Sequence, residues 1–316
     1  MLASIAVTAA LAPAAASGTG YPEVQTGLGG IAYYTAPVFA NVLCMRDQWF
    51  ITSASGMAAL PHPAPYFSRD GYPLYMATNL PYVTRTQQNS DTRDRTNLCV
   101  GRVVLTWLGD ADVRVDNASI VSGSVSGVVL DGRREYYFGG SGLGFDVKIH
   151  AINSNNPPRA IRLWLPDPAD PMNKSLEPAP GQPEPLFHPL YTGMLKPFKL
   201  LRFMDWLRTN GSTQRNWEDH RPATHCFQNG PVESASGVSA GASYEMCAAL
   251  CNEVGADMWL CVPHMATDEY VTNLARLILH GSDGWNPYMS NTPAPLYPPL
   301  STNLRLFVEY SNEMWN

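Results

Sequence analysis

Residues 244–262, YEMCAALCNEVGADMWLCV, contain a helical pattern followed at once by a strand pattern, and this combination decides the fold class. Four residues recur at the spacing of one helical face: Cys247, Leu250, Cys251 and Val254. Gly255 stands at the position where a glycine commonly follows a helix. The run 258–262 is apolar at every position, as in a parallel strand that is covered on both faces. The stretch therefore predicts a helix that leads into a strand of a parallel sheet.

Three further apolar runs have the same character, at 160–165, 199–204 and 304–310. The four runs are roughly 40 to 60 residues apart, which is the spacing of β-α-β units. Between the last two, Thr267 or Asp268 can cap a second helix that Gly281 ends. The apolar face of this helix consists of Val271, Leu274 and Ile278. We therefore expect residues 157–316 to form an α/β unit with four parallel strands.

The preceding part of the chain has a different pattern. Short β-rich runs, separated by Gly, Asp, Asn and Ser, lie at 100–107, 112–115, 125–130, 134–138 and 145–152. Such regular short strands predict an antiparallel β-sandwich over residues 21–156. The proline-rich segment 166–189 is expected to be an ordered loop over the active face of the α/β unit, with a flexible linker as the alternative.

Charge and hydropathy limit the partners and the cellular location. A net charge of −6 with scattered lysines and arginines offers no basic stripe for a run of phosphates, so nucleic acid is excluded and an uncharged polar ligand is favoured. Residues 1–20 read as a signal peptide or a disordered N-terminus, which favours secretion. No later stretch approaches the ~20 apolar residues of a membrane span. No cofactor is indicated.

The six cysteines permit disulfide bonds in a secreted chain without assigning them. Cys44 and Cys99 could join within the first domain. Cys247 and Cys251 lie four residues apart on one helical face, a spacing that suits a metal, but no nearby ligand pair completes a set of four. Buried, unmodified thiols are therefore favoured over a metal site.

The strongest chemical signal is the run FVEYSNEMWN, residues 307–316. Asn312 and Glu313 stand side by side at the end of this β-rich run, with Trp315 just beyond.

This run resembles the fourth barrel strand of clan A glycoside hydrolases. By that resemblance Glu313 is the general acid/base and Asn312 contacts the sugar 2-hydroxyl. Glycosidic cleavage needs a carboxylic acid that protonates the leaving oxygen, with a pKa raised by partial burial. A neighbouring amide can hydrogen-bond the sugar as charge develops at the anomeric carbon. Arg202, in LLRFMDW at 200–206, is similar to the buried arginine of the second strand, and His264, in WLCVPH at 259–264, to the histidine that ends the third. The resemblance implies an N-terminal sandwich followed by a partial (β/α)8 TIM barrel, strands one to four.

The chain is closer still to a group of proteins sometimes labelled cellulose-binding, which carry three segments after an N-terminal sandwich. Here these segments are 202–206, Trp217 with Arg221, and 309–316. The resemblance extends from about residue 31 and is most specific from residue 161 onward.

Other roles are open for most of these residues. Arg202 could pair with Glu309 and order the barrel core, which is compatible with a role in the site. His264 could be a core histidine, and Asp205 could cap a helix or bind a sugar hydroxyl. The tryptophans could be core residues or could stack on sugar rings: Trp206, Trp217 and Trp315.

The resemblance implies a secreted glycoside hydrolase-like protein that acts on β-linked polysaccharide by acid/base-assisted retaining hydrolysis. Retaining enzymes of the clan use a second glutamate on strand seven, whereas this sequence stops at the run that resembles strand four. We therefore expect the chain alone to be inactive and its open barrel edges to favour self-association. The alternatives are a non-catalytic secreted carbohydrate-binding protein and a purely structural cell-surface module. The downstream sequence would discriminate between them.

Overall fold

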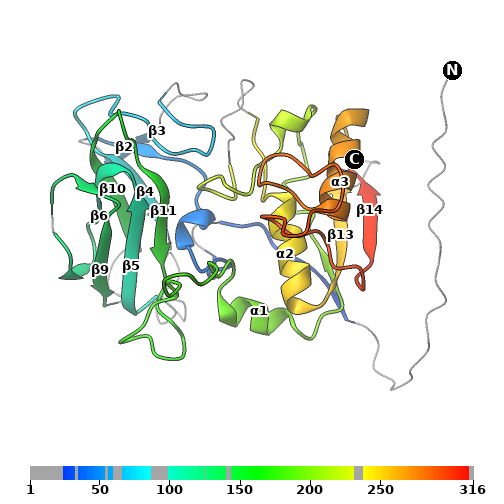
Figure 1. Ribbon diagram of the computed structural model, residues 1–316, viewed down its shortest axis with the longest axis horizontal. Helices are drawn as coiled ribbons and strands as arrows, with labels where there is room; N and C mark the ends of the chain where they lie inside the picture. The colour runs from blue at the N-terminus through cyan, green and yellow to red at the C-terminus, as the bar shows by residue number, and fades with distance from the viewer. Residues whose placement is uncertain are drawn as a thin grey trace.

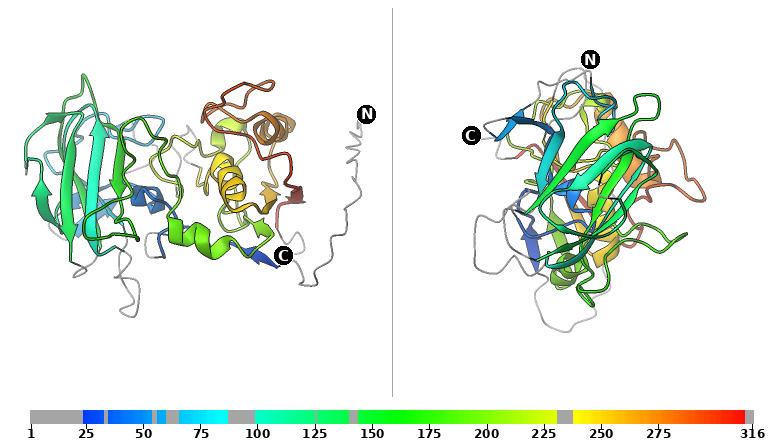
Figure 2. Two further views of the ribbon diagram at one scale, coloured as in Figure 1. Left: turned by 60° about the horizontal axis from the view of Figure 1, so that its bottom comes forward. Right: turned by 90° about the vertical axis from the view of Figure 1, so that its left-hand side faces the viewer.

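The structure is a computed structural model that describes residues 24–32, 35–53, 56–59, 66–86, 99–124, 126–139, 144–230 and 238–312. It is a mixed α/β fold, with antiparallel sheets at one end and a parallel sheet of four strands with helices at the other (Figure 1). Figure 2 shows the same two regions from a second direction. One hydrophobic cluster contains buried side chains of both regions, so they share a continuous core.

The parallel sheet has the strand order β1-β12-β13-β14. Every neighbouring pair in it is parallel. The strands are β1 (Gln25–Gly27), β12 (Leu200–Arg202), β13 (Asp257–Val262) and β14 (Leu306–Tyr310). The expected strands at 199–204, 258–262 and 304–310 are thus confirmed. Because the carboxyl ends of parallel strands share one edge, residues that follow different strands can meet there.

The prediction for the first parallel strand is wrong. The run 160–165 forms β11 (Arg159–Trp164), which pairs antiparallel with β5 (Gly101–Leu108). Ile161 and Leu163 are both 0% exposed, so β11 is apolar because it is buried within the antiparallel region and not because it belongs to a parallel sheet. The true first strand is β1, whose three residues QTG carry no apolar run. β1 thus belongs to the parallel sheet although it precedes residue 157, and β11 belongs to an antiparallel sheet although it follows that residue. The expected boundary at residue 157 therefore does not separate the two kinds of sheet.

Both predicted helices are confirmed, and a shorter one, α1 (Pro189–Leu195), precedes β12. In α2 (Tyr244–Val254) the Ser243 side chain accepts a hydrogen bond from Met246 N, and Gly255 follows with φ 73°. In α3 (Asp268–His280) Thr267 is the N-cap and Gly281 the C-cap. The predicted apolar faces are buried or half-buried, except that Val271 is 45% exposed.

The antiparallel region consists of two sheets. The six-stranded sheet has the order β3-β2-β4-β10-β6-β8, with β2 (Phe50–Ser53), β3 (Gly56–Ala59), β4 (Tyr82–Thr86), β6 (Asp110–Val115), β8 (Val129–Leu130) and β10 (Phe145–Ile152). The four-stranded sheet has the order β11-β5-β9-β7, with β7 (Ser119–Ser122) and β9 (Arg133–Phe138). Both sheets contribute fully buried residues to the shared core: Val103, Leu105, Val113, Val147 and Ile149.

The proline-rich segment after β11 is ordered but lies elsewhere than expected. The Pro171 carbonyl accepts a hydrogen bond from Arg102 N at 2.7 Å, and Glu177 forms an ion pair with Arg133 at 2.6 Å. The segment therefore covers the four-stranded antiparallel sheet instead of the carboxyl edge of the parallel sheet. The disulfide considered between Cys44 and Cys99 is absent, whereas Cys247 and Cys251 are fully buried as expected.

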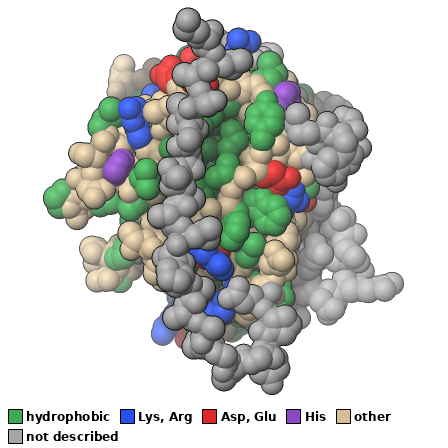
Figure 3. Space-filling view, turned by 90° about the vertical axis from the view of Figure 1, so that its right-hand side faces the viewer, with side chains coloured by type: hydrophobic (Ala, Val, Ile, Leu, Met, Phe, Trp, Pro, Cys, Tyr) green, Lys and Arg blue, Asp and Glu red, His purple; other side chains and the backbone are tan. Residues whose placement is uncertain are grey.

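The last strand of the parallel sheet is unusually exposed. Four residues of β14 are 40 to 63% exposed: Leu306, Phe307, Val308 and Tyr310. Figure 3 views the molecule from the side on which β14 lies in Figure 1, and hydrophobic side chains are visible on this face. The expectation that every parallel strand is covered on both faces therefore fails at β14. Among the described residues, no helix is long and apolar enough to cross a membrane.

Candidate functional site

The carboxyl edge of the parallel sheet brings together side chains from two non-adjacent strands. Arg202 is the last residue of β12, and Asn312 follows β14 by two residues. Arg202 Nη2 donates to Asn312 Oδ1 at 2.7 Å and to Glu309 Oε2 at 2.7 Å. The amide of Asn312 is oriented further by a bond from its Nδ2 to Asn210 Oδ1 at 2.9 Å. Arg202 thus forms the expected ion pair with Glu309 and also positions Asn312.

Glu309 is the carboxylate at the centre of this cluster. Its Oε2 also accepts hydrogen bonds from Trp259 Nε1 at 3.1 Å and from Cys261 Sγ at 3.4 Å. Partial burial alone would raise the pKa of Glu309, but the bonds from Arg202, Cys261 and Trp259 and the charge of Arg202 outweigh it and lower the pKa. Glu309 is therefore ionised at neutral pH and cannot act as a proton donor.

The neighbouring side chains support this charge pair. The Arg202 guanidinium lies over the Trp259 ring at 5.0 Å from its centroid, a cation–π contact. Burial, followed by the charge of Glu309, raises the pKa of Cys261 to about 12, so the thiol stays protonated and can donate. Neither Trp259 nor Cys261 was singled out from the sequence, because both fit the apolar pattern of a strand.

His264 reaches the same edge from β13. It follows the strand by two residues, and its carbonyl accepts a hydrogen bond from the Tyr310 hydroxyl at 2.7 Å. Its side chain is exposed, so the alternative reading of His264 as a core histidine is wrong. The structure thus brings His264 to the edge that carries Arg202 and Asn312, with no hydrogen bond between the His264 ring and a described residue.

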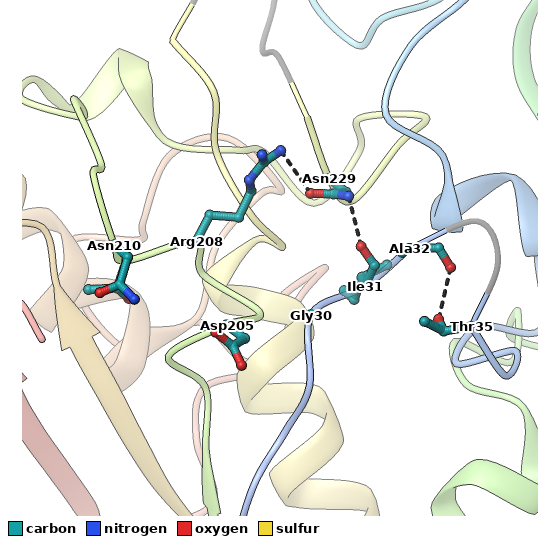
Figure 4. Close-up of a pocket in the computed structure, with 9 residues that line it drawn as sticks. Gly30, Ile31, Ala32, Thr35, Asp205, Arg208, Asn210 and Asn229 are labelled. Atoms are coloured by element: carbon teal, nitrogen blue, oxygen red, sulfur yellow. Dashed lines mark hydrogen bonds between the residues drawn. The ribbon is translucent and has the colours of Figure 1, made fainter.

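A hollow of about 450 Å³ opens beside this cluster, past the carboxyl ends of β1 and β12 (Figure 4). It is lined by Gly30, Ile31, Ala32, Thr35, Asp205, Arg208, Thr209, Asn210 and Asn229. Asp205, one of the predicted site residues, is exposed and lines this hollow. Asn210 joins the hollow to the cluster, because it also binds Asn312. No signal in the sequence indicated that Asn210 or Asn229 would line a ligand site, since polar residues are common in loops.

The tryptophans of the β12–α2 connection are core residues. Trp206 is 1% exposed and packs against Phe39, Tyr191 and Phe203. Trp217 is 6% exposed and stacks on His220 at 3.9 Å. The prediction that Trp206 and Trp217 could stack on sugar rings is therefore wrong, because neither ring has a face open to a ligand.

Arg221, the partner of Trp217 in the sequence motif, organises the same connection. It is 1% exposed, and its guanidinium donates to the carbonyls of Phe227, Gly230, Ala240 and Gly241. These bonds tie the two ends of the connection together across residues 231–237. The segment of Trp217 and Arg221 therefore has a structural role in shaping the connection that carries Asp205 and Asn210.

The backbone at this edge is strained at two positions. Ser311 has φ 58° and Arg208 has φ 50°, values that non-glycine residues rarely adopt. Such conformations cost about 1 to 3 kcal/mol each and often accompany functional sites. Ser311 directly precedes Asn312, and Arg208 lines the hollow, so both strained residues border the cluster.

Two predicted site residues, Glu313 and Trp315, lie outside the described residues, and Glu313 follows Asn312 directly in the sequence. Within the part of the chain that the structure describes, no group of three His, Cys, Asp or Glu side chains could hold a metal ion. No family model, curated protein or solved structure matches the chain.

Proposed function

We propose that the chain is a secreted glycoside hydrolase-like protein that binds a β-linked polysaccharide at the carboxyl edge of its parallel sheet. In this proposal the parallel sheet corresponds to the first four strands of a (β/α)8 barrel, and the antiparallel sheets form an N-terminal sandwich. Glu313 serves as acid/base, Asn312 binds the sugar 2-hydroxyl, and His264 contacts the substrate. The single observation that carries the proposal is the Arg202 bond to both Glu309 and Asn312.

The chemistry of the cluster fits this assignment of roles. Glu309 is held ionised by Arg202, so it provides a fixed negative charge and not a proton. The acid role therefore requires another carboxyl group, and Glu313 directly follows the positioned amide of Asn312. An amide that is already held in position can hydrogen-bond a sugar hydroxyl without the free-energy cost of reorienting its own side chain.

A non-catalytic carbohydrate-binding protein is the second candidate. Among the described residues of the edge cluster, Glu309 is the one carboxylate, and it is engaged by Arg202, Trp259 and Cys261. No described carboxylate of the cluster is therefore available as a nucleophile. Binding without turnover is the behaviour that this observation favours.

One experiment separates these candidates. The chain is titrated with soluble β-linked oligosaccharides, and hydrolysis is assayed with a form that includes any downstream sequence, in both cases as wild type and as Glu313→Gln. An enzyme loses turnover by orders of magnitude in Glu313→Gln while it keeps sugar affinity, because proton donation is lost and little contact area changes. A binding protein shows affinity and no turnover in either form. Absence of affinity in the wild type would refute both.

A further inference from the structure

The hollow beside the edge cluster presents hydrogen-bonding groups that no described residue uses. The Asp205 carboxylate lines it and makes no hydrogen bond or ion pair with any described residue. Arg208, three residues later, directs its Nη1 to Asn229 Oδ1 at 3.2 Å and not to Asp205 (Figure 4). Asp205 therefore lines the hollow as a hydrogen-bond acceptor whose carboxylate interacts with Arg202 through charge alone.

The remaining groups of the hollow are donors. Asn210 Oδ1 is occupied by Asn312 Nδ2, so the Asn210 side chain offers its NH₂ group. Arg208 uses Nη1 alone for Asn229, and the other N–H groups of its guanidinium have no partner among the described residues. Asn229 is held in place from both sides, because its Oδ1 accepts from Arg208 and its Nδ2 donates to Ile31 O at 2.7 Å. The hollow thus combines one strong acceptor with several donors.

This mixture selects the class of ligand. A cation needs a shell of oxygen acceptors, which the NH₂ of Asn210 and the guanidinium of Arg208 do not supply. An anion would be attracted by Arg208 and repelled by Asp205, so the hollow favours neither sign of charge. A hydroxyl group both donates and accepts, and a carboxylate with two oxygens can accept from two neighbouring hydroxyls.

We propose that the hollow is a separate sugar subsite, in which Asp205 accepts hydrogen bonds from adjacent hydroxyls of a neutral sugar and Asn210 donates to it. This inference rests on the proposed function, since the sugar would belong to the polysaccharide held at Asn312. Asn210 contacts both sites and forms the wall between them. The backbone opposite Asp205 is close: a Cβ added to Gly30 would lie 3.8 Å from the Asp205 carbonyl.

The test is isothermal titration of the full chain with cellohexaose, laminarihexaose, mannohexaose and xylohexaose. For each hexasaccharide that binds wild type, Asp205→Ala should weaken affinity about 10- to 100-fold, the contribution of hydrogen bonds to a charged group. Asp205→Asn should lose a part of this, because it keeps one acceptor oxygen. The thermal unfolding midpoint should not change, because Asp205 is exposed and its carboxylate makes no hydrogen bond or ion pair with a described residue.

Glu269→Ala is the matched control, since it removes an exposed carboxylate in the first turn of α3 that lines neither the hollow nor the cluster. Binding by wild type with unchanged affinity in Asp205→Ala overturns the subsite and leaves the proposed function standing. An equal loss in Glu269→Ala also overturns it, because the effect would then be one of net charge. Failure of wild type to bind any of the four sugars refutes the proposed function itself.

Discussion

Glu245 is a buried carboxyl group whose ionisation should limit stability. It lies in the first turn of α2, is 2% exposed, and accepts a hydrogen bond from Ser282 Oγ at 2.6 Å. Burial raises its pKa to about 6 from 4.5, against the opposing effect of the Ser282 bond. Because the folded-state pKa is the higher one, the folded protein binds more protons between these two values. Its contribution to stability is therefore complete below pH 4.5 and is lost as pH rises through about 6.

The size of the effect follows from the shift. A difference of 1.5 between about 6 and 4.5 corresponds to about 2 kcal/mol of unfolding free energy, at about 1.4 kcal/mol per unit. Glu245→Gln removes the titration and retains a group that can bond to Ser282. The free energy of unfolding of wild type minus that of the variant should thus fall by about 2 kcal/mol between pH 4 and 7.5.

Urea unfolding of both proteins at a series of pH values measures this difference curve. Taking the difference cancels the titration of every other group, including the buried histidines, which act in the opposite direction. Glu269→Gln provides the baseline for removing a carboxylate from an exposed first turn. A flat difference curve for Glu245→Gln, or one that rises with pH, would refute the reasoning.

Three other perturbations test the remaining features. Burial lowers the pKa of His220 to about 4, so the free energy of unfolding of wild type minus that of His220→Gln should fall by about 3 kcal/mol as pH falls from 6.5 to 4 in the same urea assay. Trp206→Ala should lower the free energy of unfolding by about 3 to 5 kcal/mol, because the ring is in the core. Trp206→Phe should leave the sugar affinity unchanged, as measured by titration. Arg202→Met should lower the free energy of unfolding by about 1 to 3 kcal/mol, which is less than for a fully buried ion pair because Arg202 and Glu309 are partly exposed. The double variant that also carries Glu309→Leu should regain stability but not sugar affinity.

The sequence was most informative where local signals and packing agree. The C-terminal end of α2 and both ends of α3 followed from Gly255, Thr267 and Gly281, because capping depends on residues next to each other in the chain. The Arg202–Glu309 pair could also be anticipated, because both lie on strands whose order the pattern indicated.

The errors came from features that depend on distant contacts. The apolar run of β11 reflects burial, which parallel and antiparallel strands share, so its sheet could not be assigned from the pattern. A tryptophan on a loop after a strand can face a ligand or the core. For Trp206 the contact with Phe39, which lies 167 residues earlier in the chain, forms only on folding, so the sequence pattern could not show that the ring is buried. The role of Asn210 likewise depends on Asn312, 102 residues further along the chain.

The antiparallel region contributes to the candidate site without lining the cluster. Trp206, directly after Asp205, packs on Phe39 of the segment that leads into the antiparallel sheets. Farther along the same connection, the Thr224 hydroxyl and Cys226 N bond to the side chain and backbone of Asp70 at 2.5 and 2.9 Å. The loop that carries Asp205 and Asn210 is therefore fixed at both ends by residues that precede β4. Since the orientation of polar groups determines how well they bind a ligand, these contacts of Phe39 and Asp70 help to fix the geometry of the candidate site.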